Sequence, residues 1–208
     1  GSLALSIEGE AIAGGANDQQ SSSLAYDPDR NKIFVCYESP NGSFTNLLCN
    51  EISLEPITIH NSSPIATYDG SNQGKPFVYW SDHSFMITWE DGRNDGTGTD
   101  IYFQEYNYGI LSLQAGGSPI SYFNQKQERP IIVKYSEDDY VIIWEDYRST
   151  GKEYCANLYA QSYHSIDCPD QGNINNDETF NVLDIVELSI CVLTSTCDDH
   201  PFSCAADI

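Results

Sequence analysis

The sequence predicts a mainly β chain of antiparallel, propeller-like blades, followed by a small α-helical calcium-loop module at the C-terminus. Two observations predict this fold. Most of the chain repeats a pattern of short apolar strands at an interval of about 50 residues, and a run of oxygen-bearing side chains leads into an apolar segment near the end. A repeat of that length with several strands per unit is typical of β-propeller blades.

The repeat is clearest in two segments. Residues 85–104 read Phe-Met-Ile-Thr-Trp-Glu-Asp-Gly-Arg, a polar loop and then Asp-Ile-Tyr-Phe-Gln, and residues 140–161 read Tyr-Val-Ile-Ile-Trp-Glu-Asp-Tyr-Arg, a polar loop and then Ala-Asn-Leu-Tyr-Ala-Gln. A weaker copy places Tyr37 in the position of Trp89 and Trp144. Another short apolar run precedes each copy. We therefore expect three or four strands per repeat, which are antiparallel because their connections are short.

This pattern divides the chain into a repeat domain, residues 1–166, and a separate module, residues 167–208. The blades of the repeat domain are expected at about 18–66, 67–120 and 121–166. The Trp-Glu-Asp-x-Arg pattern resembles a propeller-type repeat of many secreted bacterial proteins. Closed propellers usually have four or more blades, so three blades leave two open faces. We expect the chain's own ends or another copy to cover those faces.

The repeated motif has two interpretations. In the structural one, Trp89 and Trp144 fill the spaces between blades, and an Asp–Arg pair follows each of them as a scaffold. Repetition favours this interpretation, because a catalytic group is needed only once. The alternative is a glycan-binding site lined by Trp80, Trp89 and Trp144, since aromatic faces suit carbohydrate. The motif's adjacent carboxylates would point to opposite faces of a strand. We find no catalytic constellation, and the chain is predicted not to be an enzyme.

Oxygen-bearing side chains near the C-terminus have the spacing of a twelve-residue calcium loop. An apolar run, Val182 to Leu193, follows as an exiting helix requires. This spacing suits Ca²⁺, which takes six to eight oxygen ligands. Position 1 is Asn rather than Asp, and position 6 is Glu178 rather than Gly, so we expect weak binding. The alternative is a solvated polar turn that caps a helix. The expected metal ligands are Asn173, Asn175, Asp177, Thr179 (through its carbonyl), Asn181 and Asp184.

The loop and its apolar run resemble the first half of a dockerin, the duplicated calcium-loop–helix module that docks into cohesin partners. A second loop would begin at Asp207, where only two residues of the sequence remain. A truncated chain, a cleaved protein and a half-module are the alternatives. The resemblance implies a cohesin-like partner, or an ancillary place in a polysaccharide-degrading enzyme, but a half-module lacks the second helix of ordinary cohesin binding.

Seven cysteines and no Cys-x-x-Cys pair indicate an oxidising, extracellular compartment. We predict a Cys36–Cys49 disulfide, because a hairpin folded about Gly42 and Ser43 places these two residues opposite each other. An odd number leaves one cysteine unpaired, bonded between chains or separated from its partner. The candidates are Cys155, Cys168, Cys191, Cys197 and Cys204.

Charge narrows the choice of partners. The 31 acidic and 9 basic residues give a net charge of −22, which makes nucleic acid and anionic membrane surfaces poor partners. No apolar run is long enough to predict membrane insertion. The sequence therefore predicts a non-catalytic bacterial protein, extracellular or on the cell surface, that self-associates, in one form as a fibre. The alternatives are a carbohydrate-binding propeller and an ancillary module of a dockerin-bearing polysaccharide-degrading enzyme.

Overall fold

The computed structural model describes residues 11–13, 18–60, 63–68, 70–94, 98–136, 138–149 and 155–165, together with Val182, Ile185, Val186 and Ser189. The chain divides into two compact units, Gly1–Tyr163 and His164–Ile208. The boundary expected from the sequence lay between residues 166 and 167.

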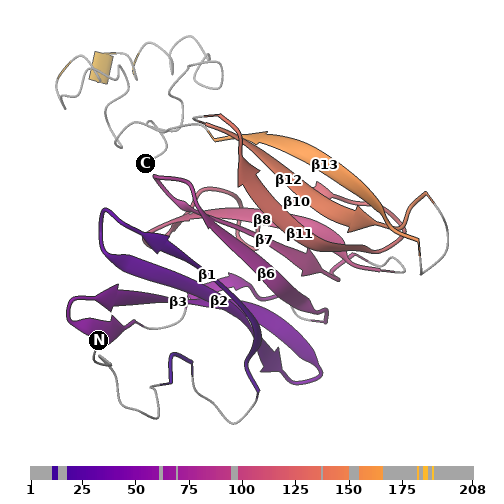
Figure 1. Cartoon of the computed structure of the whole chain (residues 1–208), viewed down its shortest axis with the longest axis horizontal. Coiled ribbons are helices and arrows are strands. Elements are labelled where there is room, and N and C mark those ends of the chain that lie inside the picture. Colours follow the sequence, from indigo (N-terminus) through magenta and orange to yellow (C-terminus); the bar gives the residue numbers. More distant parts are fainter. Residues whose placement is uncertain are drawn as a thin grey trace. The chain divides into compact units, whose positions relative to one another are not determined.

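The first unit contains three antiparallel sheets that follow one another along the chain (Figure 1). Sheet A has the order β1-β2-β3-β4, with β5 also paired to β3, and consists of β1 (Gln20–Asp27), β2 (Lys32–Asn41), β3 (Phe44–Leu54), β4 (Ile57–Ile59) and β5 (Ser63–Ala66). Sheet B has the order β10-β8-β7-β6, with β9 also paired to β8, and consists of β6 (Gln73–Trp80), β7 (Phe85–Asp91), β8 (Asp100–Asn107), β9 (Ile110–Leu111) and β10 (Ser118–Ser121). Sheet C has the order β11-β12-β13 and consists of β11 (Gln127–Lys134), β12 (Asp139–Asp146) and β13 (Asn157–His164).

Each sheet begins with the same irregularity in its first strand. A β-bulge interrupts the pairing of β1 with β2, of β6 with β7 and of β11 with β12. The bulges contain Ser21 (φ 53°), Lys75 (φ 47°) and Arg129 (φ 55°). Positive φ is uncommon for residues with a side chain, and bulges re-aim the backbone and side chains around them. The recurrence shows that the three sheets share one backbone plan.

Sheet B is buried on both of its faces. One face packs on sheet A around a core that includes Phe34, Ile87 and Trp89. The other face packs on sheet C around a core that includes Met86, Phe103 and Trp144. As a result, β7 and nearly all of β8 are buried, whereas sheets A and C each use one face in these cores. This burial accounts for the near-continuous apolar and aromatic sequence of β7 and β8.

The predicted disulfide is confirmed. Cys36 and Cys49 lie opposite each other in the β2–β3 register and are bonded. Both are fully buried in the core between sheets A and B. The bridge joins residues 13 apart in sequence, and loop closure of that length stabilises a fold by about 3 kcal/mol in the chain-entropy model.

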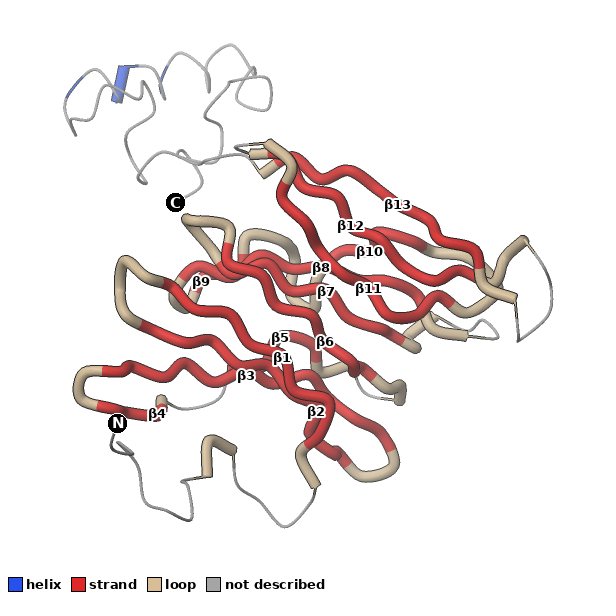
Figure 2. Tube along the Cα trace, in the orientation of Figure 1, coloured by secondary structure: helices blue, strands red, loops and turns tan. Residues whose placement is uncertain are grey.

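The expectation of a mainly β, antiparallel fold is confirmed, and Figure 2 shows strands throughout the described part of the first unit. Within the described residues the three sheets do not close into a ring. The expected helical module lies mostly outside those residues. No helix of the described residues is long and apolar enough to cross a membrane.

Candidate functional site: the junctions between the sheets

The Trp-Glu-Asp-x-Arg motif of sheet B forms a buried clasp around Asp91. Trp89 Nε1 donates to Asp91 Oδ2 at 2.8 Å. Arg93 donates its backbone N–H and its Nε to Oδ1, at 2.9 and 3.0 Å, and its Nη2 to Oδ2 at 2.6 Å. The same guanidinium donates to the Gly116 carbonyl (2.7 Å) and lies over the Tyr102 ring, 4.1 Å from its centroid. The motif itself therefore satisfies this fully buried carboxylate.

Sheet C repeats the clasp around Asp146. Trp144 Nε1 donates at 2.9 Å, and Arg148 donates its backbone N–H and its Nε, both at 2.8 Å. Arg148 also donates to Ser121 Oγ (2.7 Å) and lies over the Tyr159 ring. Burial of the carboxyl would raise the pKa of Asp146, but the hydrogen bonds from Arg148 and Trp144 outweigh it, so that pKa is lowered.

Sheet A has no such clasp. Tyr37 occupies the tryptophan position and donates its hydroxyl to Asn50 Oδ1 at 2.6 Å. Asn50 in turn donates to the His60 carbonyl at 2.8 Å. Ser39 stands where the other sheets have aspartate. The first blade therefore replaces the ionic clasp with a neutral hydrogen-bonded chain.

The structure does not bring the three tryptophans to a common open surface. Trp89 lies in the core between sheets A and B, and Trp144 lies in the core between sheets B and C. Trp80 is half-buried against Phe85, with a ring-centroid separation of 4.8 Å. Because both clasp tryptophans present their faces to protein and their N–H groups to aspartate, these residues offer no platform for a glycan.

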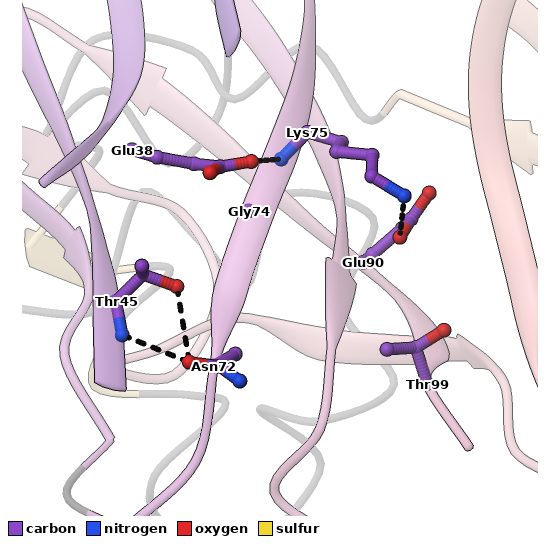
Figure 3. A pocket seen from close by; sticks show the side chains of 7 residues that line it. All are labelled: Glu38, Thr45, Asn72, Gly74, Lys75, Glu90 and Thr99. Carbon is purple, nitrogen blue, oxygen red and sulfur yellow. Dashed lines mark hydrogen bonds and ion pairs between the residues drawn. The ribbon is translucent and has the colours of Figure 1, made fainter. Parts of the chain in front are cut away.

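The motif's glutamates link neighbouring sheets through the bulges. Glu38 Oε1 accepts the backbone N–H of Lys75 at 2.8 Å, and Glu90 Oε1 accepts the backbone N–H of Arg129 at 2.9 Å. Figure 3 shows Glu38 reaching the Lys75 nitrogen, while the Lys75 side chain extends to Glu90 (2.9 Å). In both junctions a carboxylate of one sheet therefore binds the positive-φ residue of the next. As the alternation of a strand requires, Glu90 faces the opposite way from Asp91.

A threonine adds a second repeated bond at each junction. Thr45 Oγ1 donates to the Gln73 carbonyl at 3.1 Å, and Thr99 Oγ1 donates to the Gln127 carbonyl at 2.7 Å. The two threonines occupy the same place, just before or at the start of the third strand of their sheets. Sequence alignment of the repeat places Ala156 at this position of sheet C.

The Glu38–Lys75 contact borders a pocket of about 290 Å³ between sheets A and B. A Cβ on Gly74 would lie 2.5 Å from Glu38 Oε1, so only glycine allows this approach. Burial raises the pKa of Glu90 on the same pocket, against the lowering effect of the Arg129 N–H and of Lys75. The polar lining is already engaged across the junction, which makes the pocket a structural seam.

Each sheet presents one face to the sheet that follows it, and we call this the receiving face. In sheet A it contains Phe34, Cys36, Glu38, Leu47 and Cys49, and in sheet B it contains Met86, Thr88, Glu90, Ile101 and Phe103, all of them buried. The corresponding residues of sheet C are Val141, Ile143, Glu145, Leu158 and Ala160. The third receiving face has the same apolar character with one glutamate, but none of its residues is buried, and Leu158 is 76% exposed.

The predicted calcium ligands, Asn173 to Asp184, lie outside the described residues. Ile185 and Ser189 follow the loop, and the Ser189 hydroxyl donates to the Ile185 carbonyl at 2.6 Å. Among the described residues, no group of three or more His, Cys, Asp or Glu side chains is placed to hold a metal ion.

No protein-family model matches the chain, and no curated protein matches it. Among solved structures it is similar to a "Glycoside hydrolase" at 12% identity and a TM-score of 0.44, over 68% of this chain and 51% of that one. It is also similar to a protein in a complex of BT0996 and RGII, at 13% identity and a TM-score of 0.44, over 70% of this chain and 52% of that one. The chain thus spans about half the length of these two structures.

Proposed function

We propose that the chain is a non-catalytic extracellular protein that self-associates through the open faces of propeller-type blades. The observation that carries the proposal is the receiving face of sheet C, where a row of apolar side chains equivalent to two buried rows is open to solvent. Exposed apolar patches of this kind mark interaction sites. The Cys36–Cys49 disulfide is typical of an oxidising, extracellular compartment.

The native mass tests this proposal. Light scattering on non-reduced protein over a hundredfold range of concentration should show a mass that rises with concentration. The chain mass is 23.2 kDa. A constant mass near this value at every concentration and at 0.5 M salt would contradict self-association.

The calcium-stabilised module is a second part of this proposal. The spacing of Asn173 to Asp184 supports one bound Ca²⁺, held weakly, with a dissociation constant of about 10⁻⁴–10⁻³ M. Calorimetry on metal-stripped protein should show calcium binding that Asp184→Ala abolishes, because position 12 supplies the bidentate ligand. The matched control is Asp170→Ala, which lies before the loop. Absence of calcium heat at millimolar concentration would contradict this part alone. The dockerin-like resemblance adds a cohesin-like protein as a candidate partner.

One observation favours carbohydrate binding as a second candidate function. Tyr68 is exposed at a pocket of about 400 Å³, and the Arg93 guanidinium lies 5.3 Å from its ring centroid. An open aromatic face beside a hydrogen-bond donor suits a sugar ring. Affinity electrophoresis against a panel of polysaccharides should show retardation that Tyr68→Ala removes. Tyr122→Ala changes an equally exposed tyrosine away from this pocket and serves as the control. Equal retardation of both variants would exclude this pocket.

A further inference from the structure

The junction bonds form a series that leaves one glutamate at its end without a following sheet. Glu38 serves sheet B and Glu90 serves sheet C, each by accepting a bulge N–H. Glu145 holds the same position in sheet C. It accepts a bond from Arg129 of its own sheet (3.0 Å), and no bulge N–H of the described residues reaches it. The carboxylate that joins sheets elsewhere is thus present on the open receiving face.

The matching element lies at the other end of the series, in β1. Ser21 is an exposed bulge residue in the same conformation as Lys75 and Arg129. Leu24 occupies the position of Val78 and Ile132 in their sheets. Those two residues insert into the junctions and are 5% and 4% exposed, whereas Leu24 is 61% exposed. β1 therefore carries both features that a receiving face binds, and both are open to solvent.

We propose that the receiving face of sheet C binds β1 of a second copy of this chain. Leu24 of one copy would pack among Val141, Ile143 and Leu158 of the other, and Glu145 would accept the Ser21 N–H. The argument is continuity with two junctions already present in the fold, which β6 and β11 make with the same residue positions. This inference rests on the proposed self-association and adds its chemistry and its direction.

Two features set the extent and strength of the contact. On the same side of sheet A as Leu24, Val35 and Tyr37 of β2 are buried, which confines the contact to β1. Ala156 lacks the hydroxyl that Thr45 and Thr99 use at the internal junctions, so this junction has one hydrogen bond fewer. A net charge of −22 on each copy opposes association until salt screens it. Association should therefore strengthen between about 0.05 and 0.5 M sodium chloride, as the Debye length falls.

Such a contact is heterologous, because it joins different surfaces of the two copies. Repeated contacts of this kind give a ring if the rotation closes and a fibre if it does not. A symmetric contact between two sheet C faces would instead stop at a dimer.

Two exposed-site variants distinguish these arrangements by sedimentation velocity. Leu158→Lys blocks the receiving face, and Leu24→Lys blocks β1. We expect each variant alone to be monomeric and an equal mixture of the two to form dimers and nothing larger, because one intact pair of surfaces remains. Tyr122→Lys makes the same charge change at another exposed site and should associate like the wild type. Circular dichroism establishes that each variant is folded.

The outcomes separate this inference from the proposal beneath it. A monomeric wild type at all concentrations and salt levels overturns self-association itself. An associating wild type whose mass is unaffected by Leu24→Lys overturns the head-to-tail contact and leaves self-association standing. Ala156→Thr supplies the missing hydroxyl and should tighten association by about two- to tenfold, the usual contribution of one hydrogen bond. Weaker association of Ala156→Thr would also count against a junction of the internal kind.

Discussion

Sheets B and C contain the same Trp-Glu-Asp-x-Arg clasp but differ in what surrounds it. Sheet B is enclosed between two neighbours, whereas sheet C has one neighbour and one open face. Equivalent residues therefore differ in burial: Ile101 is fully buried, while Leu158 is largely exposed. The clasp holds each sheet's own strands and loops together, and the receiving face joins one sheet to the next.

The largest difference should come from the clasp carboxylates. Asp91→Ala leaves a buried arginine and an indole N–H without their partner, and removal of one member of a buried ion pair costs about 3–5 kcal/mol. Asp146→Ala should cost less, because the Arg148 side chain is 23% exposed against 13% for Arg93. Urea unfolding followed by tryptophan fluorescence measures both, since all three tryptophans lie in the first unit.

The surface variant Asp29→Ala is the control for this pair and should be close to neutral. A greater loss of stability for Asp146→Ala than for Asp91→Ala would mean that enclosure on both faces does not strengthen the clasp.

The receiving faces give the next largest contrast. Ile101→Ala empties a buried site and should reduce the free energy of unfolding by about 2–5 kcal/mol. Leu158→Ala, at the equivalent position, should change it by about 0.5 kcal/mol or less in a monomeric sample, as is usual for surface substitutions. Both are measured by the same urea titration. A loss as large as that of Ile101→Ala for Leu158→Ala in dilute monomer would show that this face is covered within the chain.

A pH titration of stability separates the two glutamates. Burial raises the pKa of Glu90 above its unfolded value. Its protonated carboxyl therefore contributes stability that is fully present below the unfolded pKa of about 4.5 and is lost as pH rises through the folded value. Glu90→Gln, which does not ionise, should remove this loss between the unfolded pKa and neutrality. The test compares thermal unfolding across this range with that of Glu145→Gln, the variant at the same position on the open face. Identical profiles for the wild type and Glu90→Gln would contradict it.

The sequence was sufficient for features that side chains themselves specify. The alternating apolar runs and the repeated motif placed β2, β7 and β12 and their partner strands close to their observed positions, and the hairpin register identified Cys36 with Cys49. The burial of Trp89 and Trp144 followed from repetition. These predictions succeed because periodicity and cross-strand pairing are local properties of the chain.

The junctions could not be predicted in this way. Glu38 and Glu90 bind main-chain N–H groups, and a backbone donor leaves no mark in the sequence. The three bulge residues, Ser21, Lys75 and Arg129, share a backbone conformation but no side-chain type. For this reason the motif's glutamate was not linked to the next sheet from the sequence. The repeated Glu before the clasp aspartate, present also as Glu38, was the available signal.

The smallest effect should come from the junction threonines. Thr99→Val keeps the side-chain shape but removes the hydroxyl that bonds the Gln127 carbonyl at 2.7 Å, and should cost about 0.5–1.5 kcal/mol. Thr45→Val removes the longer bond to the Gln73 carbonyl (3.1 Å) and should cost less. Ala156→Thr adds a hydroxyl where no sheet follows within the described residues, so the unfolding of dilute monomer should not change. Urea unfolding of the three variants, at a concentration where the wild type is monomeric, compares two occupied junctions with an open one. Stabilisation of the monomer by Ala156→Thr would show that its hydroxyl finds a partner inside the chain, and the open face would then not await a second copy.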